Sequence, residues 1–233
     1  MIDMEWLDGI LKADRQLFVF LNSFYSDFGD TFMFFVTRKE TWLLFYLILL
    51  FYIFKTYRSK GFLIVLFLVA GIVLSDQLSG VIKESVQRLR PVYEPQIQHL
   101  VHNFFRKGGL YGFFSSHASN AFFLVTFTSY IFKNRFYRNV LILWALLVCY
   151  SRIYLGVHFP LDILGGVVFG YLLGWILYKI MMFIENHFFI ARQPKIGKTR
   201  LDTSDAVVIL LVLVVTICTM LILTRHLHHY QLL

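Results

Sequence analysis

The chain has 233 residues, of which 58% are hydrophobic, against roughly 45–50% in soluble globular domains. This composition excludes an ordinary soluble domain and indicates an integral membrane protein. The formal net charge of +8 does not indicate a nucleic-acid partner, because the basic residues lie mostly in short segments between apolar stretches, where they match membrane topology and anionic lipid. Two cysteines are too few for a disulfide framework or a zinc site.

The N-terminal region, residues 1–40, mixes apolar residues with acidic ones. This pattern predicts one or two amphipathic helices that lie in the membrane interface, with a break at residues 22–30. We therefore treat the region as an interfacial segment that precedes the membrane core.

Six apolar stretches follow, close to the roughly 20 residues that a helix needs to cross a hydrocarbon core of ~30 Å. The first has the shortest strongly apolar part, residues 42–54. We predict an all-α fold, a polytopic transmembrane helical bundle with about six spans and N-terminal amphipathic interfacial helices. The predicted spans are residues 41–57, 61–82, 116–132, 140–155, 160–184 and 206–224.

Three glycines recur at four-residue spacing in the fifth predicted span, at Gly166, Gly170 and Gly174. Small residues on one helical face allow close contact with another helix. We interpret the pattern as packing within the chain, with dimerisation as the alternative. The oligomeric state stays open.

A pair of cations, Lys83 and Arg90, lies seven residues apart at the end of the second span. This spacing places both on one helical face, and two cations at the membrane surface predict a receptor for a multiply anionic group. Pro91 is expected to end the helix. Arg88 points away from that face and is interpreted as a lipid-headgroup contact. Asp76, about two turns deeper, is either a buried partner of a cation or a polar lining of the cavity.

A second polar cluster, FFSSHASN at residues 113–120, lies where the chain re-enters the membrane. Ser115 is placed to cap the following helix, whose first N–H groups and dipole would point at an anion. His117 falls in the first turn. The cluster predicts a phosphate cradle with a proton-transfer residue beside it.

The third cluster is SRIYLGVHFPLD, residues 151–162, which keeps three costly polar side chains in an apolar region. His158 and Asp162 are four residues apart, so the carboxylate can accept the imidazole N–H and leave the other ring nitrogen free to attack. Arg152 lies near the exit of the fourth span. The pattern predicts a nucleophilic histidine with an orienting acid.

Together the three clusters resemble the signature of the type 2 phosphatidic acid phosphatase (PAP2) family, whose site is shared with vanadium-dependent haloperoxidases. The motifs are KESVQRLRP at residues 83–91, the Ser-x-His of FFSSHA, and SRIYLGVHFPLD. The second departs from the family, because Phe114 and Ser116 stand where proline and glycine are usual. Ser116 still offers its backbone N–H to phosphate, so we expect activity to survive.

The resemblance implies a metal-independent reaction through a phosphohistidine, with no cofactor and no metal site. His158 would attack phosphorus while Asp162 orients it, and His117 would protonate the leaving oxygen and then activate water. The groups that would hold the phosphoryl oxygens are Lys83, Arg90, Ser115, the N–H of Ser116, and Arg152.

The resemblance also implies a phosphatase whose partners are the bilayer and a membrane lipid phosphate or diphosphate. Undecaprenyl diphosphate is the first expectation, with lipid A or phosphatidylglycerophosphate and phosphatidate as alternatives. A non-catalytic lipid-phosphate binding or transport protein is the alternative from another class, and a haloperoxidase is disfavoured because such enzymes are soluble. The chain then divides into an interfacial segment (1–40), a PAP2-like catalytic membrane core (41–184), and a loop with a C-terminal transmembrane helix (185–233).

The distribution of basic residues sets the expected orientation. One set of alternate loops carries cations with no chemical role, and these loops are expected to be cytoplasmic. We therefore predict an integral protein of the cell (inner) membrane whose active site faces the extracytoplasmic side. The cations of the cytoplasmic set are Lys55, Arg58, Lys60, Lys133, Arg135, Arg138, Arg192, Lys195, Lys198 and Arg200.

Overall fold

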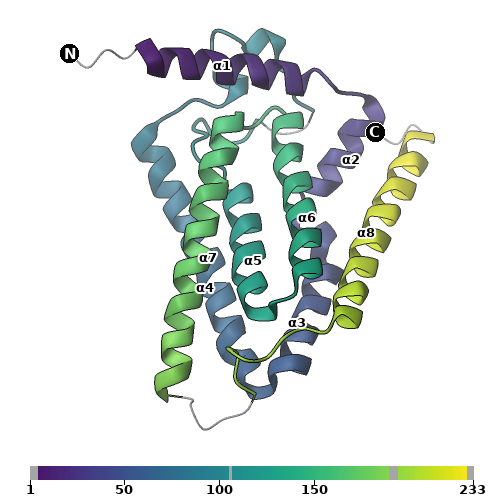
Figure 1. Ribbon diagram of the computed structural model, residues 1–233. Helices are drawn as coiled ribbons and strands as arrows, with labels where there is room; N and C mark the ends of the chain where they lie inside the picture. Colours follow the sequence, from purple (N-terminus) through teal and green to yellow (C-terminus); the bar gives the residue numbers. More distant parts are fainter. Residues whose placement is uncertain (1–4, 105–106, 189–193, 230–233) are drawn as a thin grey trace.

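The computed structural model describes residues 5–104, 107–188 and 194–229. Within these ranges the chain forms eight α-helices and no β-strand (Figure 1). Six of the helices form a bundle, and each coincides with one of the predicted apolar stretches. They are α3 (Leu43–Tyr57), α4 (Gly61–Val86), α5 (Ser116–Phe132), α6 (Arg135–Tyr154), α7 (Pro160–Phe188) and α8 (Thr203–His229).

Four stretches of the described chain are long and apolar enough to cross a membrane: Lys39–Val86, Arg135–Tyr154, Pro160–Phe188 and Thr203–His228. The first contains both α3 and α4, which meet at a 3-10 turn and run in opposite directions (Figure 1). α5 has 17 residues and contacts α4, α6 and α7, so it is the central helix. The all-α membrane bundle is confirmed, while the number of six crossings stays a prediction.

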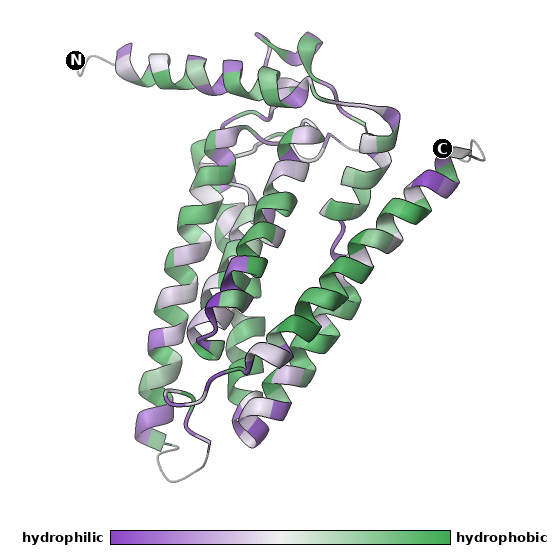
Figure 2. Ribbon diagram, turned by 45° about the vertical axis from the view of Figure 1, so that its right-hand side comes forward, coloured by the Kyte–Doolittle hydropathy of each residue, from purple (hydrophilic) through white to green (hydrophobic). Residues whose placement is uncertain are grey.

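The bundle helices are apolar over most of their length (Figure 2). α8 is the clearest case, since it is hydrophobic along its length and becomes polar near its C-terminal end (Figure 2). Many large side chains on the outer faces of these helices are exposed, among them Leu143 and Ile222. An apolar outer surface is what a lipid environment requires.

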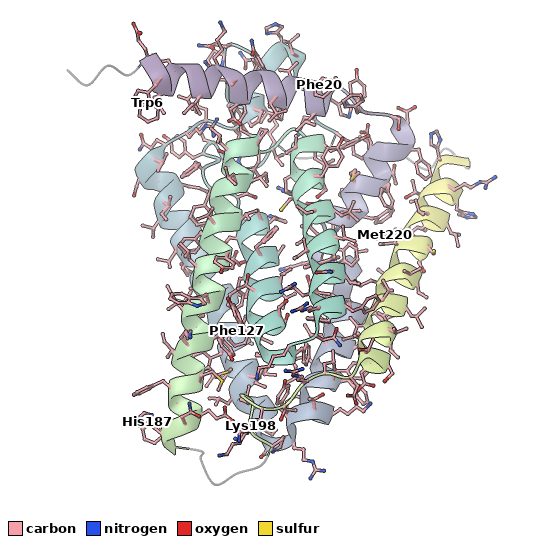
Figure 3. All side chains as sticks on the ribbon, viewed as in Figure 1. Trp6, Phe20, Phe127, His187, Lys198 and Met220 are labelled. Carbon is pink, nitrogen blue, oxygen red and sulfur yellow. The ribbon has the colours of Figure 1, made fainter. Side chains whose placement is uncertain are left out.

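α1 (Glu5–Asn22) lies across one end of the bundle (Figure 1). Asp14 and Phe18 are buried on the face toward the bundle, whereas Trp6 and Phe20 are exposed (Figure 3). A helix with exposed aromatic side chains at the end of a membrane bundle fits the predicted interfacial helix.

α2 (Asp27–Thr37) turns into the bundle instead of lying flat beside α1 (Figure 1). Its N-cap is Ser26, within the predicted break, whose hydroxyl accepts a hydrogen bond from Gly29 N at 3.1 Å. It then contacts α6 and α8 and leads into α3. The 15 residues of α3 reach only about 22 Å, less than the ~30 Å hydrocarbon core, so α2 adds length on the same side of the bundle.

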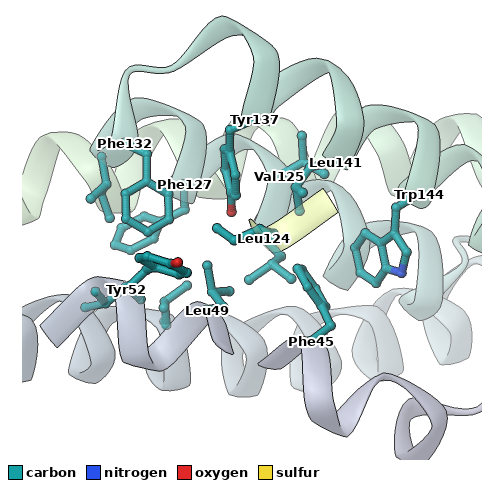
Figure 4. Close-up of a cluster of buried hydrophobic side chains, with 14 of the residues drawn as sticks. Phe45, Leu49, Tyr52, Leu124, Val125, Phe127, Phe132, Tyr137, Leu141 and Trp144 are labelled. Atoms are coloured by element: carbon teal, nitrogen blue, oxygen red, sulfur yellow. The ribbon is translucent and has the colours of Figure 1, made fainter. Parts of the chain in front are cut away.

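The core lies where α3, α5 and α6 meet and is rich in aromatic rings (Figure 4). Two buried tyrosines keep their hydroxyls satisfied: Tyr137 donates to Thr128 Oγ1 at 2.8 Å, and Tyr57 donates to the Ile131 carbonyl at 2.7 Å. Large apolar side chains fill the rest, including Phe45, Leu49, Leu124, Phe127, Leu141 and Trp144.

α5 and α7 pack closely through the glycine face predicted from the sequence. A Cβ atom added at Gly166 would overlap the carbonyl oxygen of Ser115, the N-cap of α5, and one added at Gly170 would overlap that of Ser119 within α5. One added at Gly174 would approach the Thr126 side chain. The glycine spacing is therefore explained by helix packing within the chain.

A buried ion pair closes the end of the bundle opposite α1. Lys60 Nζ donates to Glu185 Oε1 at 2.5 Å, and the same oxygen accepts a hydrogen bond from Ile196 N at 2.8 Å. Both side chains are almost completely buried. This end is thus held together by α4, α7 and the segment before α8, and the predicted site residues lie at the other end.

Candidate active site

The three polar clusters predicted from the sequence meet beneath α1 (Figure 1). Arg90 of the first cluster contacts His158 of the third, with 3.3 Å between Nη1 and Nε2. Ser115 of the second donates its backbone N–H to the Asp162 carbonyl at 3.0 Å. Lys83 donates to the Ser116 hydroxyl at 2.5 Å. Residues 79 positions apart in the sequence are therefore brought to one place.

His158 is buried in the short turn between α6 and α7. Arginine can only donate, so His158 Nε2 is the acceptor in its contact with Arg90 and the ring proton lies on Nδ1. Nδ1 is 3.5 Å from Asp162 Oδ2, a contact too poorly aligned to count as a hydrogen bond. The pair predicted from the sequence is brought together, with the proton-bearing nitrogen on the carboxylate side.

The His158 imidazole is held in its neutral form. Its pKa lies well below the usual histidine range, first because of burial and then because Arg90, Arg152 and Lys83 are nearby cations. A neutral imidazole keeps the lone pair that a nucleophile or a base needs. The cations that disfavour protonation are the same ones that would attract an anion to Nε2.

Asp162 is completely buried in the first turn of α7, and each of its oxygens has a defined partner. Oδ2 accepts a hydrogen bond from Phe159 N at 3.0 Å. Oδ1 accepts one from Arg88 Nη1 at 2.7 Å. The carboxylate is thus fixed in rotation, with one oxygen toward the His158 side.

The position of Arg90 differs from the predicted helical face. α4 ends at Val86, and Gln87 adopts a left-handed conformation with φ of 52°. The chain then runs extended, and Arg90 N donates to the Leu110 carbonyl at 3.1 Å. The prediction that Lys83 and Arg90 share a helix was wrong, because the helix stops before Pro91 and the loop brings Arg90 back to the site.

Ser115 caps α5 as predicted, its hydroxyl accepting a hydrogen bond from Ala118 N at 3.4 Å. His117 follows in the first turn with an exposed side chain, and it interacts electrostatically with Arg152, His158 and Lys83. An accessible histidine surrounded by other site residues is placed to exchange protons with a bound molecule or with water.

Ser116, which departs from the usual glycine, takes part in a hydrogen-bond chain between α4 and α5. Its hydroxyl accepts from Lys83 and lies 2.7 Å from the Ser79 hydroxyl. One turn deeper, Ser75 and Ser119 are 2.6 Å apart. The extra hydroxyl therefore occupies one donor of the Lys83 ammonium.

Arg152 is tied to α2, where its Nη1 donates to Thr37 Oγ1. Its Nε is buried without a hydrogen-bond partner. A buried donor left unsatisfied is costly unless a ligand completes it. The side chain thus has capacity for an anion, as the sequence predicted for a phosphate-binding group.

One basic and one acidic side chain near the site lie in positions that differ from those interpreted from the sequence. Arg88, expected at lipid headgroups, instead points inward to Asp162 and to Asp14 of α1. Asp76 is exposed, and its carboxylate accepts from the Asn120 amide at 2.8 Å, so it is not the buried partner of a cation. The sequence signal for Arg88 was weak, because its inward direction depends on where α4 ends.

Comparison with known proteins identifies the family. Residues 61–186 match the model of the PAP2 superfamily. The chain belongs to the PAP2 superfamily. All eight predicted site residues fall inside the matched range, whereas Asp14 lies outside it.

Named relatives and a solved PAP2 structure agree with this assignment. The chain is 35% identical to a lipid A 4′-phosphatase of Porphyromonas gingivalis over 194 residues, which is 81% of either protein. It is 31% identical to undecaprenyl-diphosphatase BcrC of Bacillus subtilis over 85 residues, 36% of this chain and 43% of the relative. The crystal structure of a transmembrane PAP2-type phosphatidylglycerolphosphate phosphatase from Bacillus subtilis aligns with a TM-score of 0.59 at 24% identity, covering 77% of this chain and 89% of its own, and shares the fold.

Proposed function

We propose that this PAP2 protein is an integral-membrane lipid phosphatase that uses His158 as its nucleophile. The observation that carries the proposal is the buried, neutral imidazole of His158, with Nε2 beside the Arg90 guanidinium and Nδ1 on the Asp162 side. Phosphoryl transfer needs a positioned nucleophile among fixed cations.

In the first step the His158 Nε2 lone pair forms a bond to phosphorus, and the bond from phosphorus to the lipid oxygen breaks. A phosphate oxygen that accepts from Arg90 would take this donor away from Nε2 and free the lone pair for attack. Arg152 and Lys83 disfavour a proton on His117 in the free site, and the negative charge of the bound phosphate offsets them, so that protonated His117 gives its proton to the leaving oxygen. The charge on the transferring group is spread over Lys83, Arg90, Arg152 and the α5 N-terminus at Ser115 and Ser116.

In the second step water attacks the phosphohistidine. His117, now deprotonated, takes a proton from the water, the phosphorus–nitrogen bond breaks, and inorganic phosphate leaves. Cleavage of that bond leaves His158 neutral, and the proton taken from water restores protonated His117. Asp162 keeps the imidazole oriented throughout.

We propose that the reaction needs no metal ion. In the described parts of the chain, no group of three or more His, Cys, Asp or Glu side chains could hold one. Three cations already face the nucleophile, and they supply the charge stabilisation that a divalent ion would otherwise provide.

We propose a lipid A phosphate as the substrate. The similarity to lipid A 4′-phosphatase extends over most of both chains, whereas the match to an undecaprenyl-diphosphatase covers about a third of this one. Undecaprenyl diphosphate, the first expectation from the sequence, thus becomes the second candidate.

The test is inorganic phosphate release by purified protein in detergent with excess chelator. The panel is lipid A, undecaprenyl diphosphate, phosphatidylglycerophosphate and phosphatidic acid, each also given to His158→Ala. We expect fastest release from lipid A, no effect of the chelator, and no release by the variant. Folded wild-type protein that releases phosphate from none of the four lipids would favour the lipid-phosphate binding or transport alternative.

We also propose that the protein lies in the inner membrane with its site on the extracytoplasmic side. The turns after α3 and α5 and the described segment before α8, residues 194–202, lie at the end of the bundle opposite the proposed site (Figure 1). This end carries cations that the sequence marks as cytoplasmic, including Arg58, Arg135 and Lys198, whereas Arg192 of the same set lies outside the described residues.

A further inference from the structure

The Arg88 guanidinium joins two buried carboxylates from different helices. Nη1 donates to Asp162 Oδ1 of α7 at 2.7 Å, and Nη2 donates to Asp14 Oδ2 of α1. The guanidinium carbon lies 4.5 Å from the centre of the Phe159 ring, so the side chain is also held by a cation–π contact. Arg88 is thus fixed on three sides next to the proposed orienting acid.

Asp14 of α1 is linked to the proposed site by a separate contact through each of its carboxylate oxygens. Its side chain is only 3% exposed although it belongs to a helix that is otherwise largely exposed. While Oδ2 accepts from Arg88, Oδ1 accepts from Leu161 N at 2.9 Å in the first turn of α7. One carboxylate therefore holds both Arg88 and the turn that carries Asp162. Burying a charge is costly, and this one is compensated only by those contacts.

The consequence for Asp162 is a fixed rotation of its carboxylate. Arg88 occupies Oδ1, which leaves Oδ2 for Phe159 N and for the side of His158 Nδ1, 3.5 Å away. If Arg88 were free to move, it could pair with both oxygens in the bidentate geometry that arginine prefers. Its attachment to Asp14 restricts it to one of them.

We propose that Asp14 and Arg88 are positioning residues for the reaction, with α1 supplying the carboxylate that holds Arg88 so that Asp162 Oδ2 faces His158. This inference rests on the proposed function, since it takes His158 as the nucleophile. It assigns a role in the reaction to a helix that lies outside the range matched by the superfamily.

Charged and titratable groups of every neighbouring element surround His158, and a change at Asp14 acts on its pKa together with them. Removing the Asp14 charge leaves less negative charge near the imidazole and frees Arg88 to neutralise Asp162, and both effects disfavour the imidazolium. The groups are Lys83 of α4, Arg88 and Arg90 of the following loop, His117 of α5, Arg152 of α6 and Asp162 of α7.

The test compares Asp14→Asn with Asp8→Asn, which removes an exposed carboxylate from the same helix. The substrate is whichever panel lipid is hydrolysed fastest. For Asp14→Asn we expect kcat to fall by about tenfold or more with KM unchanged, because misplacement of reacting groups by ~1 Å can cost about a hundredfold. The acid limb of its kcat/KM profile should move to lower pH. Asp8→Asn should behave as wild type, and Asp14→Glu should recover part of kcat with the wild-type profile.

Wild-type kcat and an unshifted pH profile in folded Asp14→Asn would overturn the inference. The inference would also be overturned if Asp14→Asn lost activity only in proportion to a loss of thermal stability, while the acid limb of its kcat/KM profile stayed at the wild-type pH. If Asp14→Asn does not fold, Arg88→Lys tests the same link, because an ammonium keeps the charge but cannot contact both carboxylates as the guanidinium does. An unchanged kcat in Arg88→Lys would also overturn the inference. Activity retained by His158→Ala would instead contradict the proposed function itself.

Discussion

At the scale of single residues, the environment of His158 makes a prediction about pH. Burial and the neighbouring cations lower its pKa well below the ordinary value of about 6.5. A nucleophile must be neutral, so kcat/KM should persist as pH falls through about 6.5 and decline only at lower pH. Arg90→Gln removes one of these cations and should move the acid limb to higher pH. The comparison is made on one lipid, because the titration of the substrate is then common to both proteins. A wild-type limb at or above 6.5 would contradict this account.

His117 gives a prediction about the intermediate. Its side chain is accessible and lies among Arg152, His158 and Lys83. We expect His117→Ala to form phosphohistidine from substrates with good leaving groups and to hydrolyse it slowly, because no base remains to activate water. Acid-quenched protein labelled with ³²P measures this. Complete loss of label in a folded variant would argue against the role in hydrolysis.

Ser116 tests how the departure from the usual family motif is accommodated. Its hydroxyl accepts from Lys83, and Ser79 lies within reach of the same ammonium at 3.5 Å. In Ser116→Gly the ammonium keeps a partner and gains a free donor for phosphate, so kcat/KM should change by less than about tenfold, the equivalent of one net hydrogen bond. Lys83→Met is the matched comparison and should lose far more. A large loss in Ser116→Gly would instead assign the hydroxyl a direct part in the reaction.

At the scale of helices, the sequence predicted what depends on local composition. The apolar stretches located the bundle helices, and Ser115 was recognised as the cap of α5. The end of α4 could not be placed, because Gln87 adopts its left-handed conformation without the glycine that usually marks such an end. The inward turn of Arg88 and its link to Asp14 followed from that same unpredicted end. Ion pairs between distant residues that depend on the path of one loop cannot be predicted from local sequence patterns.

The glycine face between α5 and α7 gives a prediction about stability. Gly170 lies so close to the Ser119 carbonyl that any side chain must push the helices apart. Gly170→Leu should lower the free energy of unfolding by about 1–3 kcal/mol or more, as overpacking does. Thermal unfolding in detergent measures it. Gly80→Leu on α4 is the control, because a Cβ there meets nothing within 4 Å. Equal melting temperatures for both variants would show that the close packing is not needed.

At the scale of the whole molecule, the arrangement of the helices separates two ends with different tasks. One end holds the proposed site under α1. The other is closed by the Lys60–Glu185 pair and by Lys133, which donates to the carbonyls of Ile196 and Gly197. Burial lowers the pKa of Lys133, and the nearby Glu185 carboxylate opposes this shift. Because the α1 end gathers the proposed site residues, the side of the membrane on which that end lies decides which leaflet supplies the substrate.

The orientation can be read with single cysteines. The native Cys149 and Cys218 are first replaced by serine. Arg135, the first residue of α6, and Lys107, in the loop before α5, are both exposed and mark opposite ends of the bundle. In spheroplasts, a membrane-impermeant maleimide should label Lys107→Cys directly and Arg135→Cys only after permeabilisation, because the cations of the second loop favour the cytoplasm. Phosphate release by each variant confirms that it is folded. The reverse labelling pattern would place the proposed site on the cytoplasmic side, where it could act only on lipid phosphates of the inner leaflet. The cations at the α1 end, and not those at the opposite end, would then have determined the topology.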